Sequence, residues 1–351
     1  MRVLVTGHLG YIGPHLVDLL LADGHHVTGV DLDLFGDSTI HPFALPQENR
    51  VMDIFDLTPD DLRGHDAVIH LAAISNDAMG ILNSELTWKV NYEGTLHVAE
   101  CAKRAGVPRF LQSSSCSVYG KTNDKPVDEN GEASPVSTYA ETKVRVEQAL
   151  SRLADSTFSP VYLRNATAYG SSPRLRLDLV LNNLLASAYT TGVIKVLTDG
   201  TPWRPLIHCR DIGRAFVHFL KAPRDLIHDQ PFNVGSHPET YQVRDVANLV
   251  KKLMPDCELS FAEGSTSDPR DYKVDFTKLN TTFPDFQLAY TLADGGRELH
   301  DHFRKYDLPA DCLTGDRFIR LKTLKRKLHR GEVPAYFHLA EKTEPRREKV
   351  A

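Results

Sequence analysis

Long hydrophobic runs are missing from this 351-residue sequence, and no apolar stretch approaches the ~18 residues that a membrane-spanning helix requires. The N-terminus also lacks the basic segment followed by an apolar one that is typical of a secretory signal. We therefore expect no membrane partner and a cytoplasmic location.

Cysteine is scarce, and the few cysteines form no Cys-x-x-Cys pair. They lie far apart in the chain, at Cys101, Cys116, Cys209, Cys257 and Cys312. This usage is typical of a reducing compartment and predicts no disulfide framework. The 16 histidines contain no His-Glu-x-x-His motif, so the sequence predicts no catalytic metal.

An excess of positive charge is also absent. The 41 lysines and arginines are outnumbered by 46 aspartates and glutamates, which leaves a formal net charge of -5. Such a chain has no broad positive field, so we expect no nucleic-acid partner. Any phosphate group that the protein binds must be held by a local site.

The first half of the sequence does contain a regular alternation of short apolar runs and amphipathic stretches. Strands are expected at residues 2–6, 26–30, 50–52, 67–71, 109–112 and 161–164, and helices at 11–22, 84–105 and 137–153. Alternation of this kind predicts an α/β fold, a doubly wound parallel Rossmann sheet with helices on both faces.

After residue 170 this rhythm loosens, and we expect a smaller α/β lobe in the C-terminal half. The predicted divisions are a Rossmann domain at 1–170, to which 210–235 returns, a smaller lobe at 171–316 and a basic tail at 317–351. Within the tail, Leu321, Leu324 and Leu328 recur at helical spacing. This spacing predicts a helix docked on the rest of the protein.

A dinucleotide-binding motif stands at the N-terminus, where the first predicted strand runs into a Gly-x-x-Gly-x-x-Gly turn and then a helix. Gly7 permits the tight turn, Gly10 lets the backbone approach a pyrophosphate, and Gly13 lets helix and strand pack closely. The N–H groups at the start of the helix then hold the anion.

Asp31 closes the second predicted strand, where its carboxylate can accept hydrogen bonds from a ribose. A carboxylate at this position repels the 2′-phosphate of NADP, and residues 32–35 offer no arginine to receive it. The sequence therefore favours NAD as the cofactor.

Tyr139 and Lys143 lie at positions i and i+4, on one face of the predicted helix at 137–153. A free tyrosine has a pKa near ~10, so a tyrosine that acts as a base near neutrality needs its pKa lowered by ~3 units, which corresponds to about 4 kcal/mol. A lysine ammonium one turn away, with a cationic nicotinamide ring nearby, can supply that field.

A serine-rich segment at 113–117 follows the predicted strand at 109–112, at the sheet edge where α/β proteins bind ligands. A hydroxyl there can donate to a sugar oxygen as that oxygen becomes a carbonyl. The alternative is a serine-rich loop that satisfies only its own backbone.

Further motifs, together with these, occur in a fixed order along the chain. They are His70-Leu-Ala-Ala73, Asn91-x-x-Gly-Thr95, Val118-Tyr-Gly120, Asp199-Gly-x-x-x-Arg204-Pro-x-Ile-His208-x-x-Asp211 and Phe232-Asn-Val-Gly235. The ordered set, which spans roughly residues 1–280, resembles the extended short-chain dehydrogenase/reductases. Within them it resembles the NAD-dependent nucleotide-sugar epimerase/dehydratase family.

The resemblance implies a catalytic role for three residues. Tyr139 matches the general acid/base, Lys143 its partner, which also contacts the nicotinamide ribose, and Ser115 the hydroxyl that binds the reacting sugar oxygen. The residues expected to contact NAD are Gly7, Gly10, Tyr11, Ile12, Gly13, Asp31, Asp53, Ile54, Leu71, Ala72, Ala73, Asn91, Tyr139 and Lys143.

The resemblance also implies a nucleotide-diphosphate sugar as substrate, bound by the lobe at 171–316. The residues expected to contact it are Ser75, Ser115, Ser117, Thr167, Asn182, Arg204 and Arg270. Arg204 matches an arginine on the diphosphate, for which a guanidinium fork is well suited. Asp53 and Ile54 match contacts on the adenine side of NAD.

The chain departs from the family pattern directly after the catalytic hydroxyl. Sugar 4,6-dehydratases of the family carry an Asp-Glu pair there, whereas this chain has Cys116 and Ser117. Elimination of water by that route therefore lacks its acid. The segment 164–170 also replaces the family's aromatic pair and asparagine, which leaves the identity of the sugar open.

Three functions remain open at this point. The first is an epimerase, with C4 as the inverted centre, in which a bound keto-sugar receives the same hydride on its other face. The second is a net nucleotide-sugar dehydrogenase or ketoreductase, and the third is a catalytically silent NAD-binding regulator, which the intact Ser115, Tyr139 and Lys143 disfavour. The helices at 84–105 and 137–153 resemble those that pair in family homodimers, so we expect a homodimer.

Overall fold

A seven-stranded parallel sheet forms the centre of the computed structural model, which describes residues 1–75, 80, 83–122, 125–262 and 270–337. The strand order is β10-β6-β5-β4-β1-β2-β3. The strands are β1 (Arg2–Thr6), β2 (His26–Asp31), β3 (Glu48–Val51), β4 (Ala67–His70), β5 (Arg109–Ser115), β6 (Ser159–Asn165) and β10 (Gln230–Val234). The predicted doubly wound Rossmann sheet is confirmed.

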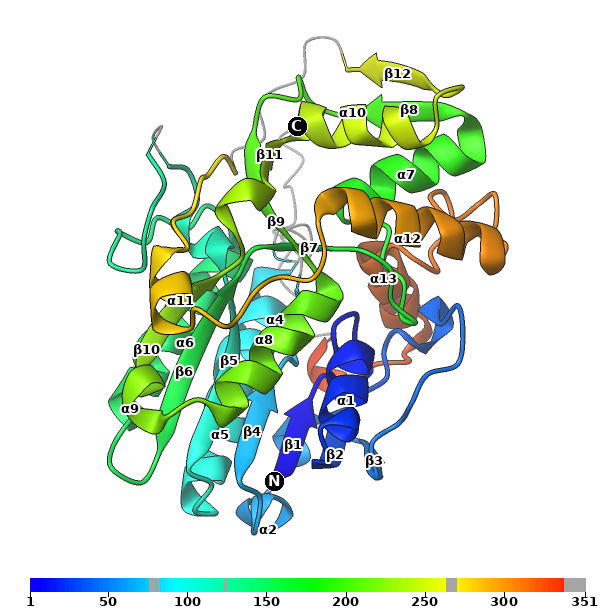
Figure 1. The fold of residues 1–351 in the computed structure, drawn as a ribbon. Coiled ribbons are helices and arrows are strands. Elements are labelled where there is room, and N and C mark those ends of the chain that lie inside the picture. The colour runs from blue at the N-terminus through cyan, green and yellow to red at the C-terminus, as the bar shows by residue number, and fades with distance from the viewer. Residues whose placement is uncertain (76–79, 81–82, 123–124, 263–269, 338–351) are drawn as a thin grey trace, which may run out of the picture.

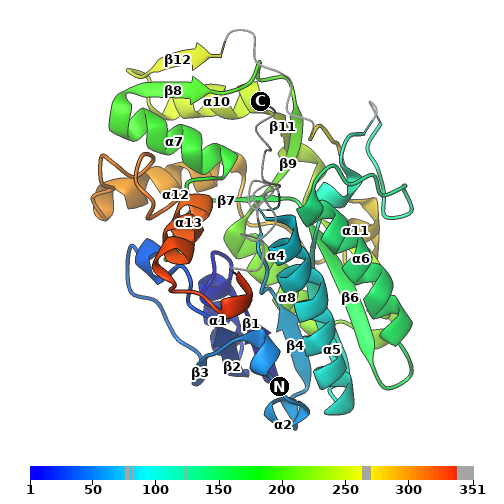
Figure 2. The same cartoon turned by 180° about the vertical axis from the view of Figure 1, so that it is seen from behind.

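Helices cover both faces of this sheet because its strands are apolar on both sides. On one face lie α1 (Gly13–Ala22) and α8 (Cys209–Lys221), as Figure 1 shows, and on the other lie α4 (Ser84–Trp88), α5 (Gly94–Arg104) and α6 (Thr138–Leu153), as Figure 2 shows. Successive side chains of a strand point to opposite faces. Val3 and Val5 accordingly join one buried cluster with Phe216, and Leu4 joins another with Val98.

Short segments complete the main layers. They are the 3₁₀ turns η1 (Gly36–Ser38), η2 (Ile54–Asp56), η4 (Cys116–Tyr119) and η5 (His237–Glu239), with the short helices α2 (Pro59–Leu62), α9 (Arg224–Ile227) and α11 (Thr277–Thr282). The helix predicted at 84–105 is divided by one π-helical segment, η3 (Lys89–Glu93). Within η3, the Asn91 amide binds both the N–H and the carbonyl of Ile74, which links this segment to the loop after β4.

The smaller lobe lies above the carboxyl ends of the main strands (Figure 1). It contains a three-stranded sheet of order β11-β9-β7 and a two-stranded sheet of order β12-β8. Its strands are β7 (Thr167–Tyr169), β8 (Val193–Val196), β9 (Trp203–His208), β11 (Thr240–Gln242) and β12 (Glu258–Phe261), and its helices are α7 (Val180–Thr191), α10 (Val243–Leu253) and α12 (Leu292–Lys305).

The last helix, α13 (Arg320–Arg330), lies between α12 and the region of β2 (Figures 1 and 2). Its Leu324 is 1% exposed, and Leu321 and Leu328 pack beside it. The helix ends at Gly331, whose φ of 68° is the left-handed conformation common at helix ends. Of the predicted tail at 317–351, residues 338–351 lie outside the described part of the chain.

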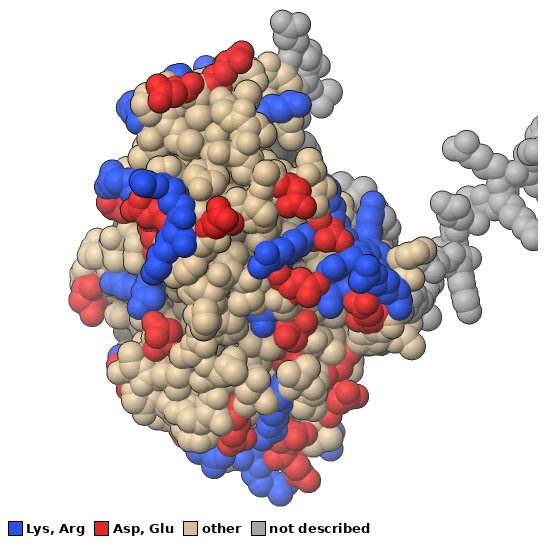
Figure 3. Space-filling model, turned by 90° about the vertical axis from the view of Figure 1, so that its right-hand side faces the viewer, with Lys and Arg blue, Asp and Glu red and all other residues tan. Residues whose placement is uncertain are grey.

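Acidic and basic side chains are interspersed on the surface that contains this helix, as Figure 3 shows. Within the described residues, no helix is both long and apolar enough to cross a membrane. All five cysteines are buried and unpaired.

Candidate active site

The glycine turn between β1 and α1 packs against the loop after β4 so closely that side chains are excluded. Gly7 has a φ of +74°, and a Cβ on it would lie 2.6 Å from the nitrogen of Ala72. A Cβ on Gly13 would lie 2.1 Å from the carbonyl oxygen of His8. Both positions therefore require glycine, and the turn lies at a helix N-terminus, where Rossmann folds hold a pyrophosphate.

Other predicted members of the turn also have internal hydrogen bonds. The Gly10 N–H donates to Gly7 O at 3.1 Å and so closes the turn. The Tyr11 side chain is buried, and its hydroxyl donates to Gly170 O at 2.5 Å. Ile12 precedes α1 as its N-cap, so the helix begins two residues later than predicted.

Asp31 ends β2 beside this turn. Its carboxylate accepts the N–H groups of Leu9 (2.9 Å) and Asp33 (2.8 Å), which orients it at the edge of the sheet. Burial raises the pKa of Asp31, and the two N–H groups oppose that shift. Each carboxylate oxygen retains a second lone pair for a ribose hydroxyl.

Arginines from distant segments reach this region, although residues 32–35 contain none. Arg174 forms an ion pair with Asp33 at 2.8 Å. Arg320 of α13 lies 4.0 Å over the ring of Phe35. The sequence of residues 32–35 could not predict either contact, because both arginines come from segments far away in the chain.

The predicted acid/base pair lies in the first turns of α6. Ser137 caps the helix by accepting the N–H of Ala140. The Lys143 ammonium is 5.6 Å from the centre of the Tyr139 ring and donates to Ser113 O at 2.6 Å. Burial lowers the pKa of Lys143 to about 8. The hydrogen bond to Ser113 holds α6 against the carboxyl end of β5.

Ser115 ends β5, two residues beyond this hydrogen bond. Its hydroxyl oxygen accepts the N–H of Ser117 at 3.1 Å. The Cys116 thiol donates to Arg164 O, and burial raises the pKa of this thiol far above its usual value. Cys116 is therefore a buried thiol rather than a catalytic acid, whereas the buried Ser117 hydroxyl oxygen has no hydrogen-bond partner among the described residues.

A buried ion pair between β6 and α6 supports the carboxyl end of β5. The Arg164 guanidinium binds both oxygens of Glu147, with the shortest contact at 2.7 Å, and donates to the Tyr119 hydroxyl at 2.9 Å. Ser114 donates to the same carboxylate at 2.5 Å. The pair fastens α6 to β5 and β6, and the sequence offered no motif that would have revealed it.

The remaining predicted cofactor residues lie on loops beside the glycine turn. Leu71, Ala72 and Ala73 follow β4 directly. His70, which precedes them, bridges the hydroxyls of Thr6 (2.7 Å) and Thr95 (3.0 Å). Burial lowers the pKa of His70 to about 3, so this imidazole is neutral.

Asp53 and Ile54 lie at the start of η2. One Asp53 carboxylate oxygen accepts the Phe55 N–H at 3.0 Å. The other accepts the hydroxyl of Tyr336 at 2.7 Å. The predicted adenine contact is therefore bonded to the C-terminal segment.

Three of the predicted substrate residues gather around one tyrosine. The Thr167 hydroxyl lies 3.5 Å from the Tyr272 hydroxyl, and the Arg204 guanidinium is 5.5 Å from the Tyr272 ring centre. Burial raises the pKa of Tyr272, while the charges of Arg204 and Arg270 lower it. Arg204 is 6% exposed, so it is not a surface arginine. Tyr272 itself was not predicted.

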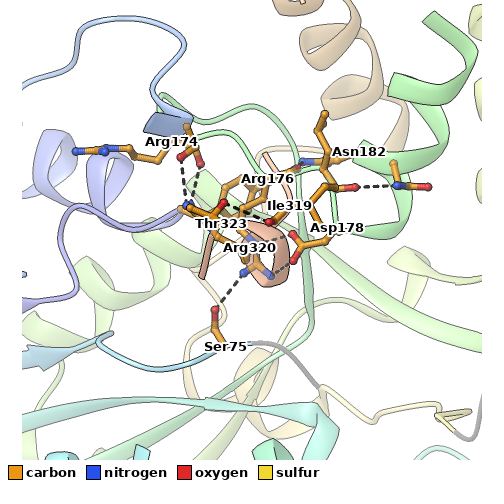
Figure 4. Close-up of polar contacts among 12 residues, drawn as sticks. Ser75, Arg174, Arg176, Asp178, Asn182, Ile319, Arg320 and Thr323 are labelled. Carbon is orange, nitrogen blue, oxygen red and sulfur yellow. Dashed lines mark hydrogen bonds and ion pairs between the residues drawn. The ribbon is translucent and has the colours of Figure 1, made fainter. Parts of the chain in front are cut away.

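Ser75 belongs to a second group, near Tyr139. Its hydroxyl accepts a hydrogen bond from Arg176 at 3.1 Å, and Figure 4 shows Arg176 lying between Ser75 and Asp178. Burial alone would lower the pKa of Arg176, but the Asp178 carboxylate raises it overall, and Tyr139 contributes in the same direction. The charge of Arg176 is therefore balanced within the protein.

Asn182, a predicted substrate contact, forms a network of internal hydrogen bonds. Its amide accepts the N–H of Gly170 and donates to Gly170 O, Arg176 O and the Tyr11 hydroxyl. The side chain is fully buried. These bonds use the amide's hydrogen-bonding capacity, so Asn182 supports the turn after β7.

The glycine turn, Asp31 and the Tyr139–Lys143 pair lie at one edge of a Rossmann sheet, an arrangement that defines a dinucleotide-dependent enzyme. Within the described residues, no group of three or more histidines, cysteines or carboxylates could hold a metal ion. Residues 3–235 match the NAD dependent epimerase/dehydratase family. The chain belongs to this family, which confirms the predicted family and its NAD cofactor.

Comparison with known proteins gives relatives of several activities. The chain is 30% identical over 318 residues to UDP-glucose 4-epimerase of Mycolicibacterium smegmatis, covering 87% of this chain and 99% of the relative. It is 28% identical over 322 residues to UDP-glucuronic acid decarboxylase 1 of Arabidopsis thaliana, covering 89% and 72%. The crystal structure of UDP-glucuronic acid 4-epimerase from Bacillus cereus, with UDP-glucuronic acid and NAD, aligns with a TM-score of 0.77 at 25% identity, covering 87% and 99%.

Proposed function

We propose that this protein is an NAD-dependent nucleotide-sugar epimerase that inverts C4 of the sugar through a transient keto-sugar. The observation that carries the proposal is the Tyr139–Lys143 pair, held by Ser113 at the sheet edge that also carries the glycine turn. The glycine turn, which packs closely at Gly7 and Gly13, suits a dinucleotide pyrophosphate, and Asp31 suits its ribose. NAD, when bound, supplies the hydride acceptor and donor.

Residues of the chain transfer the proton and stabilise the charges that the reaction creates. Tyr139, as phenolate, accepts the proton of the C4 hydroxyl while Ser115 donates a hydrogen bond to the same oxygen. The Lys143 ammonium stabilises the phenolate electrostatically. After the ketone has turned its other face toward the cofactor, Tyr139 returns the proton. Because the bound NAD would serve as both acceptor and donor of the hydride, the reaction has no net oxidation.

The substrate is a nucleotide-diphosphate sugar. Arg204 and Arg270, which surround Tyr272, supply positive charge for the diphosphate, and Thr167 lies beside them. The names of the related proteins, which are UDP-glucose and UDP-glucuronic acid enzymes, support the same class. The dehydratase route is disfavoured because Cys116 is buried and its pKa is raised.

The second candidate is a reaction with net chemical change, which the similarity to a UDP-glucuronic acid decarboxylase favours. This second candidate also covers a net nucleotide-sugar dehydrogenase or ketoreductase. Incubation with UDP-glucose and UDP-glucuronic acid, followed by NMR of the products and NADH absorbance, separates the candidates. An isomer without NADH supports the epimerase, whereas stoichiometric NADH or release of carbon dioxide refutes it.

Replacement of the acid/base gives a direct test. Tyr139→Phe retains the ring and removes the proton carrier, so turnover should fall by about 10²- to 10⁴-fold while bound NAD is retained. Tyr189→Phe on α7 is the matched control. Unchanged turnover in Tyr139→Phe would show that the catalytic assignment is wrong and would favour a different base.

A homodimer in the cytoplasm remains part of the proposal. The faces offered for pairing are α4 and α5 together with α6, which lie side by side on one face of the sheet (Figure 2). Light scattering at twice the mass of one chain is the expected result.

A further inference from the structure

The segment from Arg317 to Phe337, here called the tail segment, lies against the side of the cofactor site where adenosine is expected. It lies beyond residues 3–235, which match the family. Its apolar residues pack in one cluster with residues that flank Asp31, the loop after β4 and α4. The cluster consists of Leu32, Leu34, Ile74, Leu86 and Val90 on the Rossmann domain and Leu321, Leu324, Leu328, Val333, Tyr336 and Phe337 on the tail segment.

Arginines of the tail segment also bind the loop at 35–39, directly after β2. Arg317 donates to two main-chain carbonyls of this loop, each at 2.7 Å. Arg326 forms an ion pair with Asp37. Arg320 lies 4.0 Å over the loop's aromatic ring and is 5% exposed. The tail segment is thus attached to this loop by hydrogen bonds, an ion pair and a cation–π contact.

Arg320 adds a buried positive charge at this end of the site. Figure 4 shows it close to Arg176 and Asp178. Burial lowers its pKa to about 9, and Asp31 is among the carboxylates that oppose this shift. The guanidinium is therefore charged at neutral pH and lies within electrostatic range of the predicted ribose contact.

Tyr336 contacts Asp53, one of the residues expected on the adenine side of NAD. Its hydroxyl donates to Asp53 at 2.7 Å, and its ring meets the Phe55 ring edge-on with centroids 5.4 Å apart. Burial raises the pKa of Tyr336 far above its usual value, so the hydroxyl remains a donor. A carboxylate oxygen can accept two hydrogen bonds, so this contact positions Asp53 and leaves it able to accept an adenine amino group.

We propose that the tail segment is the outer wall of the adenosine half of the NAD site, where it slows release of the cofactor. Tyr336 acts in it as a positioning residue for Asp53. The inference rests on the proposed function, because an epimerase that reuses its hydride benefits from a cofactor that does not leave between turnovers. It assigns the retention of NAD to residues that lie outside the family match.

Release of NAD can be measured without any sugar substrate. The purified protein, loaded with labelled NAD, is chased with excess unlabelled NAD. A chain ending at Gly331 loses Tyr336 and Phe337, and a chain ending at Phe337 keeps the whole tail segment and serves as its control. We expect release at least ten-fold faster from the shorter chain and unchanged release from the control.

A point variant tests the positioning role of Tyr336. Tyr336→Phe keeps the ring and removes one hydrogen bond to a charged group, so release should accelerate roughly ten-fold. Tyr189→Phe should leave it unchanged. The hypoxanthine analogue of NAD lacks the adenine amino group, and the full chain should release it faster than NAD. Tyr336→Phe should reduce that difference, which a merely structural residue would not do.

Several outcomes would overturn the inference. Slower release or tighter binding in the chain ending at Gly331 would show that the tail segment competes with NAD. Unchanged release, with circular dichroism showing folded protein, would show that it is no wall. If release follows the expected pattern but no sugar is epimerised, the inference stands and the proposed function fails.

Discussion

Replacing Lys143 by methionine should make the protein more stable and less active. The Lys143 side chain is 4% exposed, and burial lowers its pKa from 10.5 to about 8. The folded protein therefore holds the proton of the Lys143 ammonium less tightly than the unfolded chain does. Methionine fills nearly the same volume without the charge.

The size of the stability effect follows from the pKa difference. A shift from 10.5 to about 8 corresponds to on the order of 3 kcal/mol against folding at neutral pH. Losing the hydrogen bond to Ser113 O costs about 1 kcal/mol, because the Gln112 amide still donates to the same oxygen. We therefore expect the free energy of unfolding of Lys143→Met to be roughly 2 kcal/mol higher than that of the unchanged protein.

The sign of the effect depends on pH in a defined way. The folded pKa of Lys143 lies below the unfolded one, so the cost is complete below about pH 8 and falls as pH rises to 10.5. Urea unfolding of the cofactor-free proteins at pH 7 and above pH 10.5 measures this. Lys252→Met, on the exposed surface of α10, should show no such pH-dependent gain.

Turnover should move in the opposite direction. If the 5.6 Å between the ammonium and the centre of the Tyr139 ring is taken as the charge separation, with an effective dielectric constant of ~20, the ammonium stabilises the phenolate by about 3 kcal/mol, which corresponds to roughly 100-fold in rate. A Lys143→Met protein that is less stable at pH 7, or whose gain persists above pH 10.5, would refute the reasoning about burial. Undiminished turnover would refute the role of the charge.

Two further predictions concern the support of the site. Glu147→Gln leaves the Arg164 guanidinium buried without its anion and should cost about 3–5 kcal/mol in urea unfolding, whereas Glu147→Leu combined with Arg164→Met should cost less than the single change. Gly13→Ala places a Cβ 2.1 Å from His8 O and should abolish NAD retention and lower the unfolding temperature, while Gly10→Ala, whose Cβ meets Gly7 O at 3.1 Å, should be milder. Equal stability of Gly13→Ala and the unchanged protein would contradict the close packing.

Most strands of the main sheet could be predicted because they are short apolar runs that are buried on both faces, as Val3, Leu4 and Val5 are. The sheet of the smaller lobe could not be predicted in full. Its strand β9 combines Arg204, Pro205 and His208 with apolar residues and so lacks a simple period. Its pairing with β7 and β11 depends on segments far apart in the sequence.

The candidate site could likewise be predicted only in part from the sequence. The glycine turn and the Tyr139–Lys143 spacing are local, so the sequence alone indicated them. Tyr272 and Tyr336 belong to no motif, and their places depend on how distant segments dock. The internal hydrogen bonds of Asn182 could not be predicted for a related reason, because the buried turn that uses its amide cannot be inferred from spacing.

The late strand β10 limits how the protein can be divided into fragments. It hydrogen-bonds to β6 at the end of the main sheet, although the chain between them builds part of the smaller lobe. A fragment covering only residues 1–170 would leave one edge of β6 unpaired and remove α8 from its place against α1. Such an edge invites pairing with other chains. Recombinant versions of the cofactor half therefore need a grafted connection to β10 to stay monodisperse.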